Sequence, residues 1–472
     1  MRLRHHLRVL NEPGRLHRLR QDKGDPPKLD AQAGGRPLQP IGRRQLLAVA
    51  ILVVAVMAVI APPLLAQAFD PQAATDQMLA SVPADARARS DAYFEGGYWI
   101  RLWSTLIAAG LMIVLLHTGL SRRLREHAER LTRRRPLQVA AYAVMFIALT
   151  SIVTFPFALY TDFFREHQYG LATQTLPAWL GDQIKAFAIG LILGSLALAG
   201  LYGVLRRTPR TWWVWGTIFV IALQMLGAMV FPVFIAPVFN TYTRLEDPAV
   251  RDPILRLARA NGIHATEVWQ VDASRQTNRI SANVSGMLGT ERITLNDNLL
   301  KRCSQECIEA VMGHEMGHYV LNHVYELVIA VGLVTLVSFA VAQWAFERFR
   351  RKYESRWGVR DIADPAGLPL LVLILTIYGL VMFPVMNTLI RTNESEADVF
   401  GLNATRQPEG FAEAALKLGE YRKLDPSPWE ERLMYDHPSG RTRIFAAMTW
   451  KAEQALARKP DSVSATAPPP TR

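Results

Sequence analysis

Long apolar runs recur along the chain and are separated by polar segments. Each run holds about 20 residues, the length of helix that crosses the hydrocarbon core of a bilayer. The first run follows a basic segment too long for a cleaved signal peptide, so we expect it to be retained as a membrane helix. The pattern predicts a mainly α, polytopic membrane protein with about seven transmembrane helices. The seven runs lie at residues 45–66, 98–118, 137–160, 183–204, 212–235, 325–346 and 367–390.

Two polar segments flank the last pair of apolar runs. In the first, the stretches EVWQVD, ISANVSG and RITLNDN predict a small sheet, preceded by a helix near 248–262 and followed by a second helix. From Arg391 onward the chain reads as helical, with FAEAALKLGEYRKL the most amphipathic piece. We expect the two segments to form one small α+β domain. The expected organisation is a disordered basic tail at 1–44, a five-helix membrane region at 45–235, the first part of the polar domain at 236–324, two transmembrane helices at 325–390, the second part at 391–457 and a disordered tail at 458–472.

Composition and charge favour a membrane protein over a protein that binds nucleic acid. Hydrophobic residues make up 50% of the 472 residues and the mean hydropathy is +0.09, both high for a soluble chain. The net charge is +12, but the basic residues are concentrated between apolar runs, as in RRLREHAERLTRRR and ERFRRKYESR. Lys and Arg number eleven before the first run, seven in 119–136, three in 206–210 and six in 347–360. The positive-inside rule therefore predicts that these segments are cytoplasmic and that the polar domain lies on the opposite face.

The chain has two cysteines, Cys303 and Cys307, in the stretch CSQEC. Four residues apart on a helix is poor geometry for a disulfide. A thiolate metal site would need a second pair, which the sequence does not supply. We expect ordinary free thiols.

The stretch VMGHEMGHYVLNH, residues 311–323, has the pattern of a metal site. His314 and His318 are four residues apart, so on a helix both can offer a ring nitrogen to one metal ion. Glu315 lies on the adjacent face, where a carboxylate can activate water at the metal without being a ligand. The alternative is a helix that is rich in histidine by chance. His323 is rotated about 140° from His318 and is predicted to close the helix rather than bind metal.

A catalytic zinc needs a third protein ligand, and TNESEADVFG at 392–401 offers one. Glu394 and Asp398 share a helical face, so Glu394 can bind the metal while Asp398 accepts the N–H of a ligand histidine. Glu396 is the rival ligand, and a solvated acidic face is the alternative. His318 precedes the sixth apolar run by seven residues and Glu394 follows the seventh by four, so a membrane hairpin would bring them together.

A third stretch, YDHPSGRTRI at 435–444, offers His437. In amide hydrolysis the oxyanion needs hydrogen-bond donors or cations, and His437 is a candidate. It could equally be a surface histidine.

With His314-Glu315-x-x-His318, Glu394-x-x-x-Asp398 and Asp436-His437-Pro438 in this order, the chain resembles the type I CaaX prenyl proteases, integral-membrane zinc endopeptidases. The stretches FPFALYTDFFREHQYGLATQT (155–175), FIAPVFNTYTRLED (234–247) and VDASRQTNRISANVSG (271–286) also resemble that family. The likeness covers roughly residues 70–445.

The resemblance implies a zincin-like domain below a membrane chamber, with one zinc ion per chain. It implies that Glu315 is the general base and acid, that Asp398 orients a ligand histidine and that His437 assists the transition state. It also implies a catalytic domain that faces the cytosol, which is opposite to the prediction from the basic loops. By the same resemblance the zinc ligands are His314, His318 and Glu394, and the substrate contacts are Arg391, Arg443 and Asn283, the last in an edge strand where eukaryotic members carry an aromatic residue.

The leading hypothesis is a zinc-dependent endopeptidase that cleaves peptides or membrane proteins near the bilayer. Its substrate is either a prenylated CaaX tail or, more broadly, a misfolded or regulatory membrane protein. The Ala- and Arg-rich composition indicates a bacterial source, and hence the inner membrane. A hypothesis of another class is a non-catalytic binding chamber that keeps zinc for structure. Glu315 argues against it, because a structural site has no need of a base.

Overall fold

The computed structural model describes residues 69–285 and 291–457. The predicted span at 45–66 and the two predicted tails fall outside these residues. Within them, six helices are long and apolar enough to cross a membrane, and each overlaps one of the other six predicted runs. The prediction of a mainly helical polytopic protein is confirmed. The six spans are Ala84–His117, Arg135–Gln168, Leu176–Arg207, Trp212–Val238, His323–Trp357 and Pro365–Thr405.

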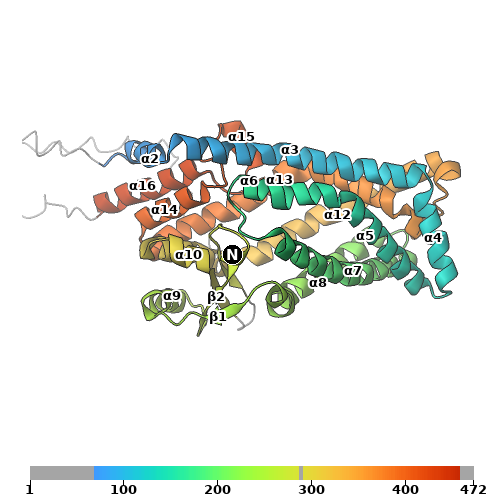
Figure 1. The fold of residues 1–472 in the computed structure, drawn as a ribbon, viewed down its shortest axis with the longest axis horizontal. Coiled ribbons are helices and arrows are strands. Elements are labelled where there is room, and N and C mark those ends of the chain that lie inside the picture. The colour runs from blue at the N-terminus through green and yellow to red at the C-terminus, as the bar shows by residue number, and fades with distance from the viewer. Residues whose placement is uncertain (1–68, 286–290, 458–472) are drawn as a thin grey trace, which may run out of the picture. The chain divides into compact units, whose positions relative to one another are not determined.

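Most of the chain is helical (Figure 1). The α-helices are α2 Pro71–Ala80, α3 Ala84–His117, α4 Leu120–Leu131, α5 Arg135–Leu159, α6 Arg165–Gln168, α7 Leu176–Arg207, α8 Trp212–Val230, α9 Pro248–Ala260, α10 Asp297–Arg302, α11 Gln305–Val320, α12 His323–Trp357, α13 Leu368–Thr405, α14 Pro408–Leu418, α15 Pro428–Met434 and α16 Gly440–Ala457. Single π or 3-10 turns extend or join them at η1 Tyr160–Phe164, η2 Phe231–Ile235, η3 Ala236–Val238, η4 Ala273–Arg275 and η5 Pro365–Gly367.

The basic segments at 119–136, 206–210 and 347–360 lie at one end of the helical bundle, where Arg125, Arg206 and Arg360 line one cavity. Figure 1 places α4 at the end opposite α10, α14 and α16. At the α4 end, Arg125 is buried and its Nη1 lies 2.7 Å from Oδ2 of Asp364, which ties α4 to the loop before α13. Because a buried guanidinium needs a paired carboxylate, this contact anchors the basic end of the bundle.

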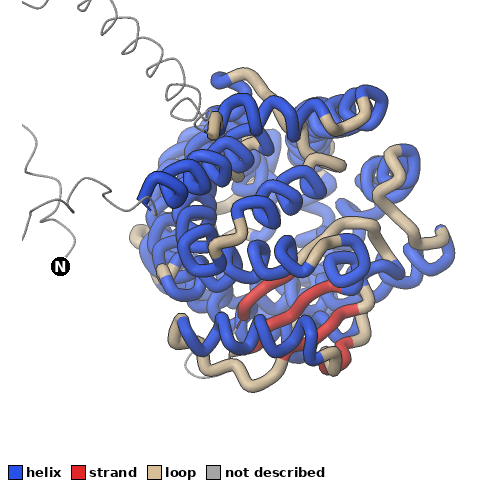
Figure 2. Tube along the Cα trace, turned by 90° about the vertical axis from the view of Figure 1, so that its left-hand side faces the viewer, coloured by secondary structure: helices blue, strands red, loops and turns tan. Residues whose placement is uncertain are grey.

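A four-stranded sheet lies at the other end, in the lower half of Figure 2 with helices above and below it. Its strands are β1 Tyr242–Arg244, β2 Val268–Val271, β3 Ala282–Ser285 and β4 Arg292–Asn296, in the order β1-β2-β4-β3. β2 and β4 run parallel, whereas β1 and β3 are antiparallel to their neighbours. The sheet shares an apolar core with α9 and α11, to which Ile254, Ile293 and Met312 contribute. The predicted helix, sheet and second helix are thus found. Strand β1 was not predicted, because its three residues, two of them exposed, carry no strand pattern.

Two helix boundaries change earlier interpretations. Asn322 has a positive φ of 62°, which ends α11 and lets α12 begin at His323. The phase argument for His323 assumed one unbroken helix and is therefore wrong. Ser304 caps α11 by accepting a hydrogen bond from Cys307 N, so Cys303 lies outside that helix. Both cysteines are free, as predicted.

Candidate active site

Close contact between α11 and α13 brings the predicted motifs together. A Cβ added to Gly401 would lie 2.8 Å from the backbone nitrogen of His314, and one added to Gly317 would lie 3.1 Å from the Cα of Ala397. Gly313 would likewise meet a side chain, Thr405 Cγ2, at 2.4 Å. These glycines let the two helix backbones approach until carboxylates on α13 reach imidazoles on α11. The sequence prediction did not use the glycines, although both α11 glycines directly precede the histidines.

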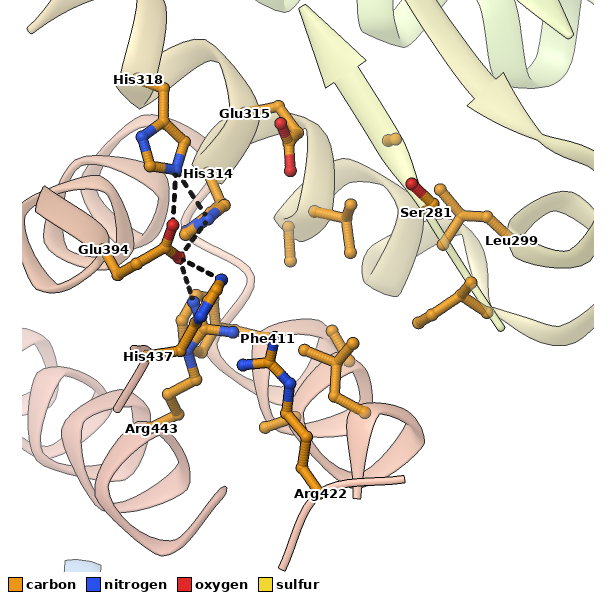
Figure 3. Close-up of a pocket in the computed structure, with 17 residues that line it drawn as sticks. Ser281, Leu299, His314, Glu315, His318, Glu394, Phe411, Arg422, His437 and Arg443 are labelled. Carbon is orange, nitrogen blue, oxygen red and sulfur yellow. Dashed lines mark hydrogen bonds and ion pairs between the residues drawn. The ribbon is translucent and has the colours of Figure 1, made fainter. Parts of the chain in front are cut away.

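His314, His318 and Glu394 converge on one point (Figure 3). The two Nε2 atoms are 3.2 Å apart, His314 Nε2 lies 3.3 Å from Glu394 Oε2, and His318 Nε2 lies 3.4 Å from Glu394 Oε1. Tetrahedral zinc with bonds of about 2.0–2.2 Å separates its ligands by about 3.3–3.6 Å. The three side chains therefore lie at about the spacing of three ligands of one zinc ion. Glu396, the rival ligand, contacts His323 instead, with 3.3 Å between its Oε2 and His323 Nε2.

Two further groups surround the three converging side chains. Asp398 Oδ1 lies 2.7 Å from His314 Nδ1, so it can fix the tautomer that leaves Nε2 free for a metal. Arg443, on α16, donates to Asp398 at 2.8 and 2.9 Å and to Glu394 at 3.3 Å. All three of Glu394, Asp398 and Arg443 are buried. The carboxylates of Glu315, Glu394 and Asp398 lie near one another beside the Arg443 guanidinium, and a divalent cation would offset part of their negative charge.

The pKa of His314 reflects this negative field. Burial opposes the imidazolium form, but Asp398 and Glu394 outweigh burial and raise the pKa of His314 to about 9. The same two carboxylates would favour a cation bound between them.

Glu315 lines the same cavity as the converging side chains. The cavity has a volume of about 300 Å³, and the Glu315 carboxylate points into it beside the two histidine rings (Figure 3). Burial raises the pKa of Glu315 above its ordinary value, although His314 and His318 act in the opposite direction. A raised pKa suits a carboxylate that takes up and returns a proton near neutral pH.

His437 reaches the site from the loop between α15 and α16. Its Nε2 lies 3.2 Å from Glu394 Oε2, and its Nδ1 lies 2.8 Å from Asp436 Oδ1. Burial lowers the pKa of His437, although Asp436 acts in the opposite direction. A second cation in the cavity, Arg422, was not predicted, because the stretch around it carries no motif.

Two residues predicted to contact the substrate, Arg391 and Asn283, do not line the cavity that holds Glu315. Arg391 is not among the residues that line the cavity, and it donates to the carbonyls of Glu431 at 3.0 Å and Arg432 at 3.4 Å. Arg391 therefore secures the end of α15 rather than facing the cavity. Asn283 lies on the edge strand β3 and lines a neighbouring cavity of about 470 Å³. Arg443, the third predicted substrate contact, lines the first cavity, and its contacts are with Glu394 and Asp398.

Two family models and several known proteins match this chain. Residues 65–241 match the family described as CAAX prenyl protease N-terminal, five membrane helices, and residues 244–451 match peptidase family M48. The uncharacterized metalloprotease YhfN of Bacillus subtilis is 29% identical over 336 residues, which are 71% of this chain and 79% of that protein. CAAX prenyl protease 1 of Saccharomyces cerevisiae is 27% identical over 316 residues, 63% of this chain and 69% of that protein.

A solved structure shares the fold. The crystal structure of S. mikatae Ste24p superposes with a TM-score of 0.68 at 22% identity, and the match covers 78% of this chain and 90% of that one. The resemblance predicted from the motifs is thus confirmed at the level of the family. This integral membrane protein belongs to peptidase family M48, the metalloprotease family of the CAAX prenyl proteases.

Proposed function

We propose that the chain is a zinc-dependent membrane endopeptidase. The observation that carries this proposal is the convergence of His314, His318 and Glu394 at ligand spacing, with the carboxylate of Glu315 beside them in one cavity. A purely structural zinc site would be closed by a fourth protein ligand. The Glu315 carboxylate in the same cavity instead supports hydrolysis over a non-catalytic binding chamber.

Glu315 would carry the proton in the reaction. Zinc held by the three ligands would supply Lewis acidity toward water and toward the peptide carbonyl. Glu315 accepts a proton from the attacking water and passes it to the nitrogen of the departing amine. Arg443 holds the buried carboxylates of Glu394 and Asp398 in place during this transfer.

His437 would stabilise the developing oxyanion. Its Nδ1 faces the Asp436 carboxylate, so Nδ1 keeps a hydrogen and Nε2 is the atom directed to the site. Nε2 can donate to an oxyanion only when the ring is protonated. The negative charge that develops on the substrate favours that protonated form.

The edge strand β3 would bind the peptide backbone. Asn296 N donates to Ser281 O at 2.9 Å, so Ser281 faces β4. Because the hydrogen-bonding direction alternates along an antiparallel strand, Ala282 and Val284 direct their N–H and C=O groups to the open edge. Ser281 and Ala282 line both the catalytic cavity and its neighbour. An extended peptide laid along this edge would reach the zinc ligands.

The membrane-embedded architecture supports substrates near the bilayer. We propose a peptide or membrane-protein substrate at the inner membrane of a bacterium, and a prenylated CaaX tail is the narrower form of this proposal. The similarity to CAAX prenyl protease 1 of Saccharomyces cerevisiae supports the narrower form. Cleavage of unprenylated proteins would support the broad form.

The test is to purify wild type and Glu315→Gln in detergent and measure zinc content and cleavage. Both a farnesylated CaaX reporter peptide and casein serve as substrates. We expect one zinc per chain in both proteins and a loss of cleavage of about 10²–10⁴-fold in Glu315→Gln. Glu306→Gln, an exposed residue on the same helix, is the control and should cleave like wild type. Equal cleavage by wild type and Glu315→Gln, or absence of zinc from both, would refute the proposal.

A further inference from the structure

A buried histidine outside the ligand set contacts one of the proposed zinc ligands. His323 begins α12 and is 4% exposed. Its ring meets the His318 ring edge-on, with 5.1 Å between centroids and an angle of 73°. Because the left-handed Asn322 turns the chain at this point, His323 lies closer to His318 than an unbroken helix would place it.

Two polar contacts connect His318 through His323 to Glu396. His318 Nδ1 lies 3.0 Å from His323 Nδ1, and His323 Nε2 lies 3.3 Å from Glu396 Oε2. When His318 offers Nε2 to zinc, the hydrogen of its neutral ring must be on Nδ1. His323 Nδ1 must then accept that hydrogen, and the hydrogen of His323 is on Nε2, directed at the Glu396 carboxylate. A single set of tautomers satisfies all three groups.

Carboxylates of α13 therefore hold the two proposed zinc ligands on α11 in different ways, one directly and one through another side chain. Asp398 contacts His314 directly at 2.7 Å. Glu394 and Asp398 share one face of α13, whereas Glu396, two residues after Glu394, lies about 160° around the helix. Glu396 reaches His318 only through the intervening ring of His323.

We propose that His323 is a positioning residue of the zinc site. It accepts the Nδ1 hydrogen of His318 and so fixes the orientation and tautomer of that ligand, while Glu396 fixes the orientation of His323. This inference rests on the proposed function, because it requires zinc on His318 Nε2. Glu396 contributes less than His323, because its side chain is 55% exposed and water can replace it.

Two substitutions show whether His323 acts as a hydrogen-bond acceptor or only fills space beside His318. His323→Asn keeps an oxygen near the place of Nδ1, whereas His323→Leu fills similar space and accepts no hydrogen bond. Loss of an outer-shell partner of a zinc ligand lowers metal affinity about 10–100-fold. We expect this loss in His323→Leu and affinity within about threefold of wild type in His323→Asn.

The experiment is competition between the full-length protein and a chelator for zinc, together with the visible spectrum of the cobalt-substituted protein. We expect the cobalt bands to shift in His323→Leu and to return toward wild type in His323→Asn. Glu396→Ala should lower zinc affinity by less than His323→Leu, and it should have no further effect when combined with His323→Leu. Glu326→Ala is the matched control, since Glu326 is an exposed carboxylate near both residues.

Several results would overturn the inference without touching the proposed function. Equal zinc affinity in His323→Leu and wild type would do so, as would an Asn variant as weak as the Leu variant. His323, Glu326 and Glu396 also lie close enough to hold an ion of their own. Two zinc ions per wild-type chain, reduced to one in His323→Leu, would show a second metal site instead. A wild type that binds no zinc would refute the proposed function itself.

Discussion

The α-carbon of Gly401 lies so close to His314 that a side chain at position 401 would meet the His314 backbone nitrogen at 2.8 Å. This contact sets the separation between the helix with the two histidines and the helix with Glu394 and Asp398. Backbone cannot move aside as a flexible side chain can, so the proposed zinc site depends on the absence of a side chain at this position.

Gly401→Ala should therefore weaken zinc binding and destabilise the protein by about 1–3 kcal/mol, the usual cost of overpacking. The measurements are zinc content after dialysis and the thermal unfolding midpoint in detergent. Gly379→Ala lies on the same helix with no atom within 4 Å of the added Cβ. It should be neutral or slightly stabilising, because alanine is favoured over glycine in helices. Equal zinc retention by both variants would show that the helix spacing is not critical.

Removal of the Arg443 charge should destabilise the protein far more than removal of the Arg441 charge. Arg443→Met leaves Glu394 and Asp398 buried without their cation, which costs about 3–5 kcal/mol in the metal-free protein. Arg441→Met, two residues earlier, removes partly exposed ion pairs with Asp76 and Asp425 and should cost about 1 kcal/mol or less. Chemical denaturation of the chelator-treated proteins measures both. Similar losses in the two variants would contradict a buried charge network.

The pH dependence of cleavage should reveal the protonation of His437. Its pKa lies below the ordinary value of 6.5, so the ring becomes neutral, and stops donating from Nε2, as the pH rises through this lowered pKa. His437→Gln presents an amide at a similar place that donates at every pH, so its rate should not fall on the alkaline side as the wild-type rate does. His437→Leu should lose about 10²–10³-fold below the pKa of His437, and its deficit relative to wild type should shrink as the pH rises above that pKa. Identical profiles for wild type and His437→Gln would exclude this role.

Proline substitutions on β3 should distinguish the N–H groups that bind the substrate backbone from those that bond to β4. Ala282→Pro removes an N–H that faces the open edge, so the protein should fold while cleavage falls about tenfold, the value of one hydrogen bond. Asn283→Pro removes an N–H directed at Thr294 of β4 and should destabilise the sheet. Steady-state kinetics and thermal unfolding separate the two outcomes. Full activity of Ala282→Pro would place the substrate elsewhere.

The membrane orientation can be read from single cysteines at the two ends of the bundle. In a background with Cys303→Ser and Cys307→Ala, Glu453→Cys is exposed on α16 and Arg130→Cys is exposed on α4. The positive-inside rule predicts that a membrane-impermeant maleimide labels Glu453→Cys, but not Arg130→Cys, in intact cells. The opposite pattern would place the catalytic end in the cytosol, as the resemblance to the CaaX proteases implies.

The sequence by itself determined the six described spans, the positions of the sheet and motif helix, and the candidate ligands His314, His318 and Glu394. These features depend on apolar length and on residue spacing within one helix, both of which are local properties. The family followed from the same motifs.

Only the tertiary structure decided between Glu394 and Glu396, because both follow the same apolar run and only the helix crossing shows which one faces the histidines. It also showed that Arg391 bonds to the end of α15 and does not line the cavity, and that His323 lies beside His318. The expected separation of His323 from His318 was wrong, because helical phase assumes an unbroken helix and the left-handed Asn322 ends α11. His323 nevertheless lies outside the group of His314, His318 and Glu394, in agreement with the prediction that it is not a ligand there. Contacts across elements depend on where helices stop and how closely they cross, and neither is encoded in the spacing of a motif.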